Sequence, residues 1–208
     1  TNVHALQAKG FSQSDGALVA IDYAGAIKAR VANSHWGDGG SFHDYTRVPR
    51  QTGSSFKPVV YLAALEKGHT PDSPVSGKRI NIDGWEPKNY DGWYPSALSL
   101  TEALSHSVNT SAVRLMQEMG KDTVDESAKR LGLNNCPEKE DDYTRALGTC
   151  EEPLVNMTGA YSVFANEGAR NDPYMIQMVR NARGKILFSK IEEPGARAIT
   201  SEAAEQMT

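Results

Sequence analysis

The amino-acid sequence predicts an α/β (α+β) domain, an antiparallel sheet flanked by helices with a helical insert. Short alternating segments near both ends of the chain are typical of strands, whereas the segments between them repeat apolar residues at helical spacing. Gly120, Gly132 and Gly168 follow three of those helical segments, where C-terminal caps belong. We therefore expect the first and last strands to pair across the helices.

The N-terminal part of the chain contains the first predicted strands. Residues 1–15 are polar and should form a linker or the end of a preceding module. Residues 18–22 and 26–31 alternate as two strands do, with Tyr23-Ala24-Gly25 between them as the turn. Residues 33–44 are rich in Gly, Ser, His and Asp and should form a loop.

The helical block opens at Ser54. A helix is predicted over residues 54–67, with Gly68 placed to end it. Residues 69–95 contain many Pro, Gly, Asp and aromatic residues and should form an ordered loop with short strands. The remaining predicted elements are helices over 101–105, 110–119, 124–131 and 153–166, a hairpin over 174–180 and 185–189, and a helix that opens at Thr200.

The composition argues against two classes of function. The formal net charge is -4 and the pI is about 5.7, and no basic stripe is visible, which argues against nucleic-acid binding. No apolar run approaches the roughly 18 residues that span a bilayer, and no signal peptide is present in these residues.

The two cysteines, Cys136 and Cys150, leave two interpretations open. They could form a disulfide in an oxidising compartment or remain free thiols, and of the two we predict the disulfide. They do not indicate a metal site, because two ligands without nearby histidines cannot fill a tetrahedral shell.

A serine and a lysine at the start of the predicted 54–67 helix form a candidate catalytic pair. Ser54 and Lys57 are three residues apart, and residues at that spacing share one face of a helix. A neutral lysine within hydrogen-bond reach can remove the serine proton and make its oxygen nucleophilic. The helix N-terminus adds N–H groups and a partial positive charge, which favour a developing anion. Because Ser-x-x-Lys also arises by chance, the assignment needs a second motif.

Ser107-Val108-Asn109, the only Ser-x-Asn in the chain, is that second motif. The Ser107 hydroxyl could relay a proton between the nucleophile, the lysine and a leaving amine. The Asn109 amide offers two donors and an acceptor for a substrate peptide bond. Ser-x-x-Lys with a Ser-x-Asn-type element and Lys-Thr-Gly is the signature of penicillin-binding proteins and related β-lactamases.

Longer segments extend this resemblance. They are similar, in order and spacing, to the transpeptidase domain of class A (bifunctional) penicillin-binding proteins, in the serine β-lactamase/penicillin-binding superfamily. The similar segments are residues 16–22, 25–29, 50–58, 61–66, 85–92, 146–149 and 160–166. The resemblance covers residues 16–208 and implies the penicillin-binding protein/β-lactamase-like transpeptidase fold.

The resemblance implies a peptidoglycan D,D-transpeptidase without cofactor or metal. Ser54 would attack the D-Ala–D-Ala bond of a stem peptide, Lys57 would act as base, Ser107 would pass the proton and Asn109 would hold the substrate backbone. An amine from a second stem peptide, on a lipid II-derived glycan strand, would resolve the acyl-enzyme, and β-lactams would acylate the same serine. The alternatives are a D,D-carboxypeptidase or β-lactamase that uses water, or a non-catalytic module that binds β-lactams or peptidoglycan.

The resemblance also implies a location and partners. We expect the domain to lie on the periplasmic face of the bacterial cytoplasmic membrane, anchored upstream of Thr1, where other cell-wall synthesis proteins could contact it. The family's Lys-Thr-Gly motif is absent from these residues, so we expect residues 16–208 to be an incomplete domain that lacks its C-terminal strands. Trp85 and Tyr90 could line a cleft or simply pack their loop onto the domain.

Overall fold

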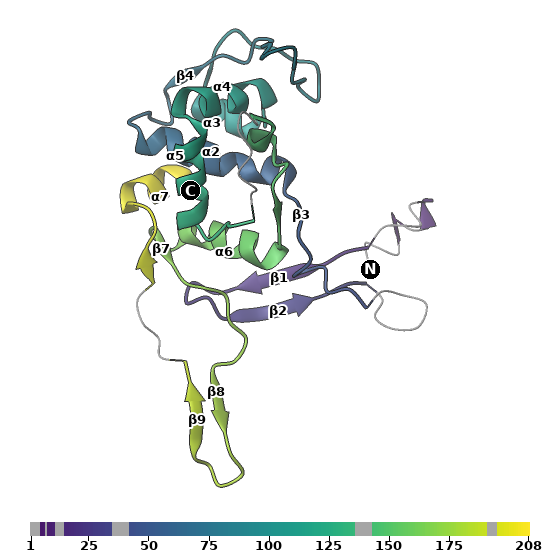
Figure 1. The fold of residues 1–208 in the computed structure, drawn as a ribbon, viewed down its shortest axis with the longest axis vertical. Coiled ribbons are helices and arrows are strands. Elements are labelled where there is room, and N and C mark those ends of the chain that lie inside the picture. The colour runs from purple at the N-terminus through teal and green to yellow at the C-terminus, as the bar shows by residue number, and fades with distance from the viewer. Residues whose placement is uncertain (1–4, 7, 11–14, 35–41, 136–142, 191–194) are drawn as a thin grey trace.

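The computed structural model describes residues 5–6, 8–10, 15–34, 42–135, 143–190 and 195–208. In these ranges the strands form two-stranded antiparallel sheets around a helical body (Figure 1). The pairs are β1 (Leu18–Ile21) with β2 (Ile27–Val31), β3 (Arg50–Gln51) with β6 (Glu151–Glu152), β4 (Pro74–Val75) with β5 (Leu98–Ser99), β7 (Ala169–Arg170) with β10 (Ala196–Arg197), and β8 (Met178–Arg180) with β9 (Ile186–Ser189).

The helix α2 (Lys57–Glu66) lies at the centre of the body, and most of its residues are buried. Its sequence is apolar all round rather than on one face, which is typical of a helix covered on every side. The elements that surround or extend it are η1 (Gly53–Phe56), α3 (Leu100–Ser105), α4 (Asn109–Met119), α5 (Lys121–Arg130), η2 (Tyr143–Leu147), α6 (Leu154–Ala165) and α7 (Ser201–Met207). All predicted helices are present, within a few residues of their predicted ends.

The predicted helix over 54–67 begins with a turn of 3₁₀ helix rather than α-helix. Pro58 has no N–H, so the carbonyl of Ser54 cannot accept the usual bond from four residues ahead. The N–H of Lys57 donates to that carbonyl instead, which tightens the turn. Ser54 therefore lies one tight turn ahead of Lys57, on a continuous helical segment.

The predicted strands and hairpin are confirmed as local pairs. The expectation that the first and last strands pair is wrong within the described residues, because β1 pairs with β2 and β10 pairs with β7. The link between the early strands and the late hairpin is one parallel bridge between Ala26 and Tyr174. Beyond that bridge, β8 and β9 leave the body together, so they are not available to extend the first sheet (Figure 1).

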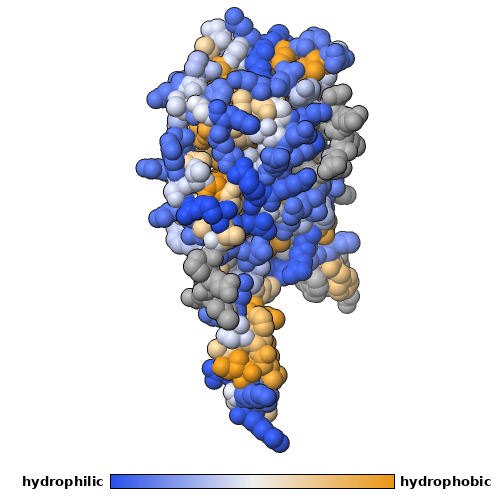
Figure 2. Space-filling view, turned by 60° about the vertical axis from the view of Figure 1, so that its left-hand side comes forward, coloured by the Kyte–Doolittle hydropathy of each residue, from blue (hydrophilic) through white to orange (hydrophobic). Residues whose placement is uncertain are grey.

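The β8–β9 hairpin carries exposed apolar side chains along both strands. Figure 2 shows them as an apolar band between the helical body and a hydrophilic tip. The exposed residues are Met178, Val179, Ile186, Leu187 and Phe188. A two-stranded hairpin buries little by itself, so these residues do not belong to the core around α2.

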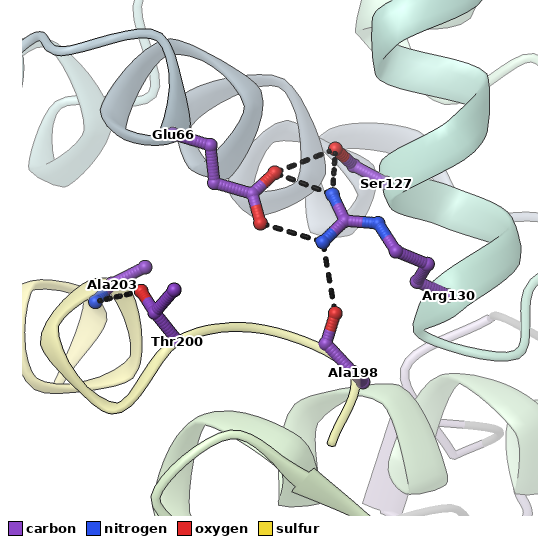
Figure 3. Close-up of polar contacts among 6 residues, drawn as sticks. All are labelled: Glu66, Ser127, Arg130, Ala198, Thr200 and Ala203. Atoms are coloured by element: carbon purple, nitrogen blue, oxygen red, sulfur yellow. Dashed lines mark hydrogen bonds and ion pairs between the residues drawn. The ribbon is translucent and has the colours of Figure 1, made fainter. Parts of the chain in front are cut away.

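A polar cluster ties the C-terminal segment to α2 (Figure 3). Arg130 donates to both carboxylate oxygens of Glu66, at 2.7 and 2.5 Å, and to the carbonyl of Ala198 at 2.8 Å. The helix predicted to open at Thr200 is present as α7, and the Thr200 hydroxyl accepts the N–H of Ala203 at 3.1 Å. These contacts join α2, α5 and α7 into one block. No described helix has the length and apolar character needed to cross a bilayer.

Candidate active site

Lys57 is the centre of the candidate site. Its side chain has no exposed surface, and its ammonium group donates to three oxygens from the start of α4 and the residues before it. These are the carbonyl of Ser107 at 2.5 Å, the hydroxyl of Ser107 at 2.8 Å and the side-chain carbonyl of Asn109 at 2.5 Å. A lysine has three N–H donors, so every proton of the buried ammonium has an acceptor. The structure thus joins three of the four predicted catalytic and substrate-binding residues.

Burial lowers the pKa of Lys57 to about 8. The cause is desolvation, which disfavours the charged ammonium. At pH 7 an amine with this pKa is neutral in about a tenth of the molecules, compared with fewer than about one in a thousand for an exposed lysine. A usable fraction of Lys57 can therefore accept a proton near neutral pH.

Ser107 adopts a left-handed backbone conformation, with φ at +53°. Few residues other than glycine do so without an external constraint. Here the N–H of Ser107 donates to Leu104 and the N–H of Val108 donates to Ala103, which ends α3 before α4 begins. This sharp turn brings both the carbonyl and the hydroxyl of Ser107 to the Lys57 ammonium.

Asn109 has its amide orientation set from both sides. Its carbonyl oxygen accepts from Lys57, and its NH₂ group donates to the backbone carbonyl of Lys88 at 2.8 Å. One amide proton and one oxygen lone pair remain for another partner. Asn109 can therefore contact a substrate peptide group without releasing Lys57.

Ser54 is exposed, and its hydroxyl makes no hydrogen bond within the described residues. Its turn is held by a segment far along the chain: Gly53 donates to Gly148 at 3.0 Å and Thr52 donates to Cys150 at 3.1 Å. From α6, the Tyr161 hydroxyl donates to the carbonyl of Ser55 at 2.8 Å. The serine therefore has a fixed backbone and a free hydroxyl.

The two aromatic residues named from the sequence lie in different environments. Trp85 packs against the hydrophobic core, and Tyr90 is fully exposed. Trp93 is the aromatic residue beside the second motif, because its ring meets His106 edge-on at 5.4 Å and His106 precedes Ser107. A role in substrate contact remains a prediction for Trp85 and Tyr90.

Cys150 is buried behind the turn of Ser54, and its carbonyl accepts the N–H of Thr52. Cys136 lies outside the described residues. The disulfide between Cys136 and Cys150 therefore stays a prediction.

Comparison with known proteins assigns the family. Residues 44–208 match the model of the penicillin binding protein transpeptidase domain. This chain belongs to the penicillin-binding protein transpeptidase family. The resemblance to class A members is confirmed by penicillin-binding protein 1A of Aquifex aeolicus, which is 37% identical over 186 residues, or 86% of this chain. Penicillin-binding protein 1A of Neisseria lactamica is 37% identical over 179 residues, or 82% of this chain.

Solved structures confirm the transpeptidase fold. Penicillin-binding protein 1A from Haemophilus influenzae superposes with a TM-score of 0.82 at 28% identity, over 93% of this chain and 34% of that one. The penicillin-binding protein PonA1 from Mycobacterium tuberculosis gives a TM-score of 0.84 at 28% identity, over 94% of this chain and 54% of that one. PonA1 has also been solved in complex with penicillin V, and that structure is 26% identical with a TM-score of 0.81.

The transpeptidase chain spans a fraction of its relatives' length. It covers 25% of the Aquifex protein and 22% of the Neisseria protein. The comparisons therefore establish a penicillin-binding transpeptidase domain of a serine acyltransferase family.

Proposed function

We propose that this domain is a D,D-transpeptidase that forms a serine acyl-enzyme from D-Ala–D-Ala stem peptides and transfers it to the amine of a second peptide. The observation that supports this most strongly is the contact of the buried Lys57 amine with Ser107 and Asn109, one helical turn after the exposed Ser54. A nucleophile, a base of lowered pKa and a second hydroxyl are the groups that acyl transfer at a serine requires.

The Lys57–Ser107 contact supports the following proposed proton path. Neutral Lys57 takes the proton of the Ser54 hydroxyl as its oxygen attacks the carbonyl of the penultimate D-Ala. Ser107, 2.8 Å from the Lys57 nitrogen, then passes a proton to the departing D-Ala amine as the C–N bond breaks. The acceptor amine reverses the path, because it loses a proton through Ser107 as it attacks the acyl-enzyme.

The charge that develops on the attacked carbonyl needs donors. The first N–H groups of a helix have no intrahelical acceptor, and Ser54 lies in the first turn of η1. Its backbone N–H serves as one oxyanion donor, and the bond from Gly53 to the Gly148 carbonyl and the bond from the Tyr161 hydroxyl to Ser55 keep the turn in place.

β-Lactams fit the same site, because their strained amide presents a carbonyl to the same serine. The penicillin V complex of PonA1 supports this, since that protein shares the fold at 26% identity. We further propose that the domain works on the outer face of the cytoplasmic membrane, where its peptidoglycan substrate is assembled.

The test uses the full-length protein and a fluorescent penicillin. We expect a single labelled serine, Ser54, identified by mass spectrometry of the tryptic digest. The Ser54→Ala variant should lose labelling and keep its melting temperature, whereas Ser55→Ala should still be labelled. Label on Ser55 or Ser107 would contradict the assignment.

The acceptor is tested by the fate of the acyl-enzyme formed from a D-Ala–D-Ala peptide. A transpeptidase should turn over faster when an amine acceptor is added and should form the cross-linked product. Turnover that water alone supports at full rate indicates the carboxypeptidase or β-lactamase alternative. No acylation at all indicates a non-catalytic binding module.

A further inference from the structure

Asn89 is a buried polar residue outside the two sequence motifs, and it is only 7% exposed. Its side-chain oxygen accepts the backbone N–H of Thr110 at 3.1 Å, in the first turn of α4. Its NH₂ group donates to the Thr110 hydroxyl at 3.2 Å and to the carbonyl of Trp93 at 2.6 Å. A buried amide with this many partners holds its surroundings firmly, because each bond it loses leaves a buried polar group unsatisfied.

The two segments that Asn89 joins both contribute to the candidate site. One is the loop over residues 76–95, and the other is the start of α4, where Asn109 precedes Thr110. The Thr110 hydroxyl also donates to the carbonyl of Gly77 at 2.8 Å. Both ends of the loop are therefore fastened to the same turn of α4.

Lys88, the neighbour of Asn89, makes the contact that orients Asn109. The backbone carbonyl of Lys88 accepts from the Asn109 NH₂ group at 2.8 Å, which leaves the Asn109 oxygen facing the Lys57 amine at 2.5 Å. An asparagine amide can rotate by half a turn, and the rotated group would present N–H donors to the Lys57 ammonium. The Lys88 carbonyl opposes that rotation, because it can pair only with a donor.

We propose that Asn89 is a positioning residue for acylation: it fixes the Lys88 carbonyl, which sets the Asn109 amide, which in turn orients the Lys57 amine. This inference rests on the proposed function. Asn89 does not touch the reacting atoms, and it acts through Asn109. Its bond to the Trp93 carbonyl also fixes the loop beside His106, next to Ser107.

Asn81 provides a matched control in the same loop. Its exposed side chain accepts the N–H of Gly84 and donates to Glu86, so it supports only its own turn. Both asparagines can be replaced by alanine in the full-length protein. The first-order acylation rate constant is then measured at saturating fluorescent penicillin, well below the melting temperature of each variant.

We expect Asn89→Ala to lower the acylation rate constant about 10- to 100-fold and Asn81→Ala to change it less than about twofold. In the Asn109→Ala background, adding Asn89→Ala should cost less than about threefold more, because the residue that transmits its effect is already gone. A merely structural role would give losses that multiply. Multiplying losses, or an Asn89→Ala rate within twofold of wild type, would overturn the proposal.

Two further measurements cover the remaining outcomes. If Asn89→Ala does not fold, Asn89→Asp replaces it: that side chain still accepts from Thr110 but cannot donate to Trp93, and the same loss and the same non-additivity are expected. If the wild-type protein is not acylated, the proposed function fails. Amide hydrogen exchange then tests separately whether Asn89 anchors the 76–95 loop to the start of α4. Faster exchange at Thr110 and residues 88–93 in Asn89→Ala, but not in Asn81→Ala, supports the anchor, and equal exchange overturns it.

Discussion

Gly148 and Gly53 meet backbone to backbone behind the candidate nucleophile. The N–H of Gly53 donates to the Gly148 carbonyl at 3.0 Å, and Gly148 has a φ of +79°. A methyl group on Gly148 would overlap the backbone of Gly53. The close approach of the two backbones therefore requires glycine at position 148, because only glycine has no side chain to overlap Gly53 and adopts this positive φ without strain.

We predict that Gly148→Ala disrupts the site and that Gly68→Ala does not. Gly68 also has a positive φ, +97°, but an added methyl group there meets nothing within 4 Å. Gly68→Ala should cost about 1–2 kcal/mol from backbone strain alone. Gly148→Ala should cost more and should lower penicillin labelling. Denaturant unfolding measures the loss of stability, and penicillin labelling measures the loss of activity. Equal losses of stability and of labelling in the two variants would show that the close approach of Gly148 to Gly53 is unimportant.

The contact between Lys57 and Ser107 predicts that these residues act as one unit. Lys57→Ala should lower the acylation rate about 10³-fold or more, because removing one member of a catalytic unit disables the rest. Adding Ser107→Ala should cost little beyond that. Ser105→Ala, which removes an exposed hydroxyl two residues away, serves as the control and should acylate at the wild-type rate. Losses that multiply in the double variant would argue against a shared proton path.

The lowered pKa of Lys57 predicts the pH dependence of acylation. In the proposed mechanism the neutral amine is the base, so the rate should rise about tenfold per pH unit below the pKa of about 8 and level off above it. Stopped-flow acylation between pH 6 and 9 measures this profile. The slower Lys57→Ala variant should lack the rise. A profile that is flat below pH 8 in the wild-type protein would mean that another group takes the proton.

The same pKa predicts how stability depends on pH. Burial lowers the pKa of Lys57 in the folded state, so between about pH 8 and 10.5 the unfolded chain binds more protons than the folded one. The free energy of unfolding should therefore rise with pH in that window, by an amount on the order of 3 kcal/mol. Comparison with Lys57→Met isolates this contribution. A wild-type minus variant difference that stays constant with pH would contradict the lowered pKa.

The paired contact of Arg130 with Glu66 predicts a role in stability rather than catalysis. A lysine cannot reproduce the two bonds to the carboxylate together with the bond to Ala198, so Arg130→Lys should cost about 1–2 kcal/mol. Arg183→Lys, on the exposed turn of the β8–β9 hairpin, is the matched control and should be nearly neutral. Chemical unfolding measures both variants, and labelling at saturating penicillin should be unchanged in each.

Much of this fold follows from local sequence patterns. The helices, the first strand pair and the late hairpin were predictable because apolar spacing, glycine caps and turn residues act within a few residues. Whether the first and last strands pair was not predictable, because local sequence patterns are the same for a hairpin that joins the first sheet and for one that projects from the helical body. The 3₁₀ turn at Ser54 depends on Pro58, and that effect was readable in principle from the missing N–H.

The site was predictable as a list of residues and not as a set of contacts. Ser54, Lys57, Ser107 and Asn109 come from motifs with a chemical rationale. The orientation of Asn109 depends on the backbone carbonyl of Lys88. Every residue has a backbone carbonyl, so the sequence does not indicate which one makes this contact. Asn89 has no such motif either, since its importance comes from its burial and from three side-chain hydrogen bonds to Thr110 and Trp93, which only the folded chain defines.

The bond between Thr52 and Gly148 joins residues 96 positions apart, so the turn that holds Ser54 is completed late. At typical rates of protein synthesis, the residues that close this turn are added about 5–20 s after the serine itself. Long-range contacts of this kind also form slowly, because the loop between them must close first. During that interval the serine is an ordinary side chain on an unfinished helix. Under the proposed function, β-lactams should therefore acylate only a chain whose later segments have already docked, so Ser54 would be synthesised early and become reactive last.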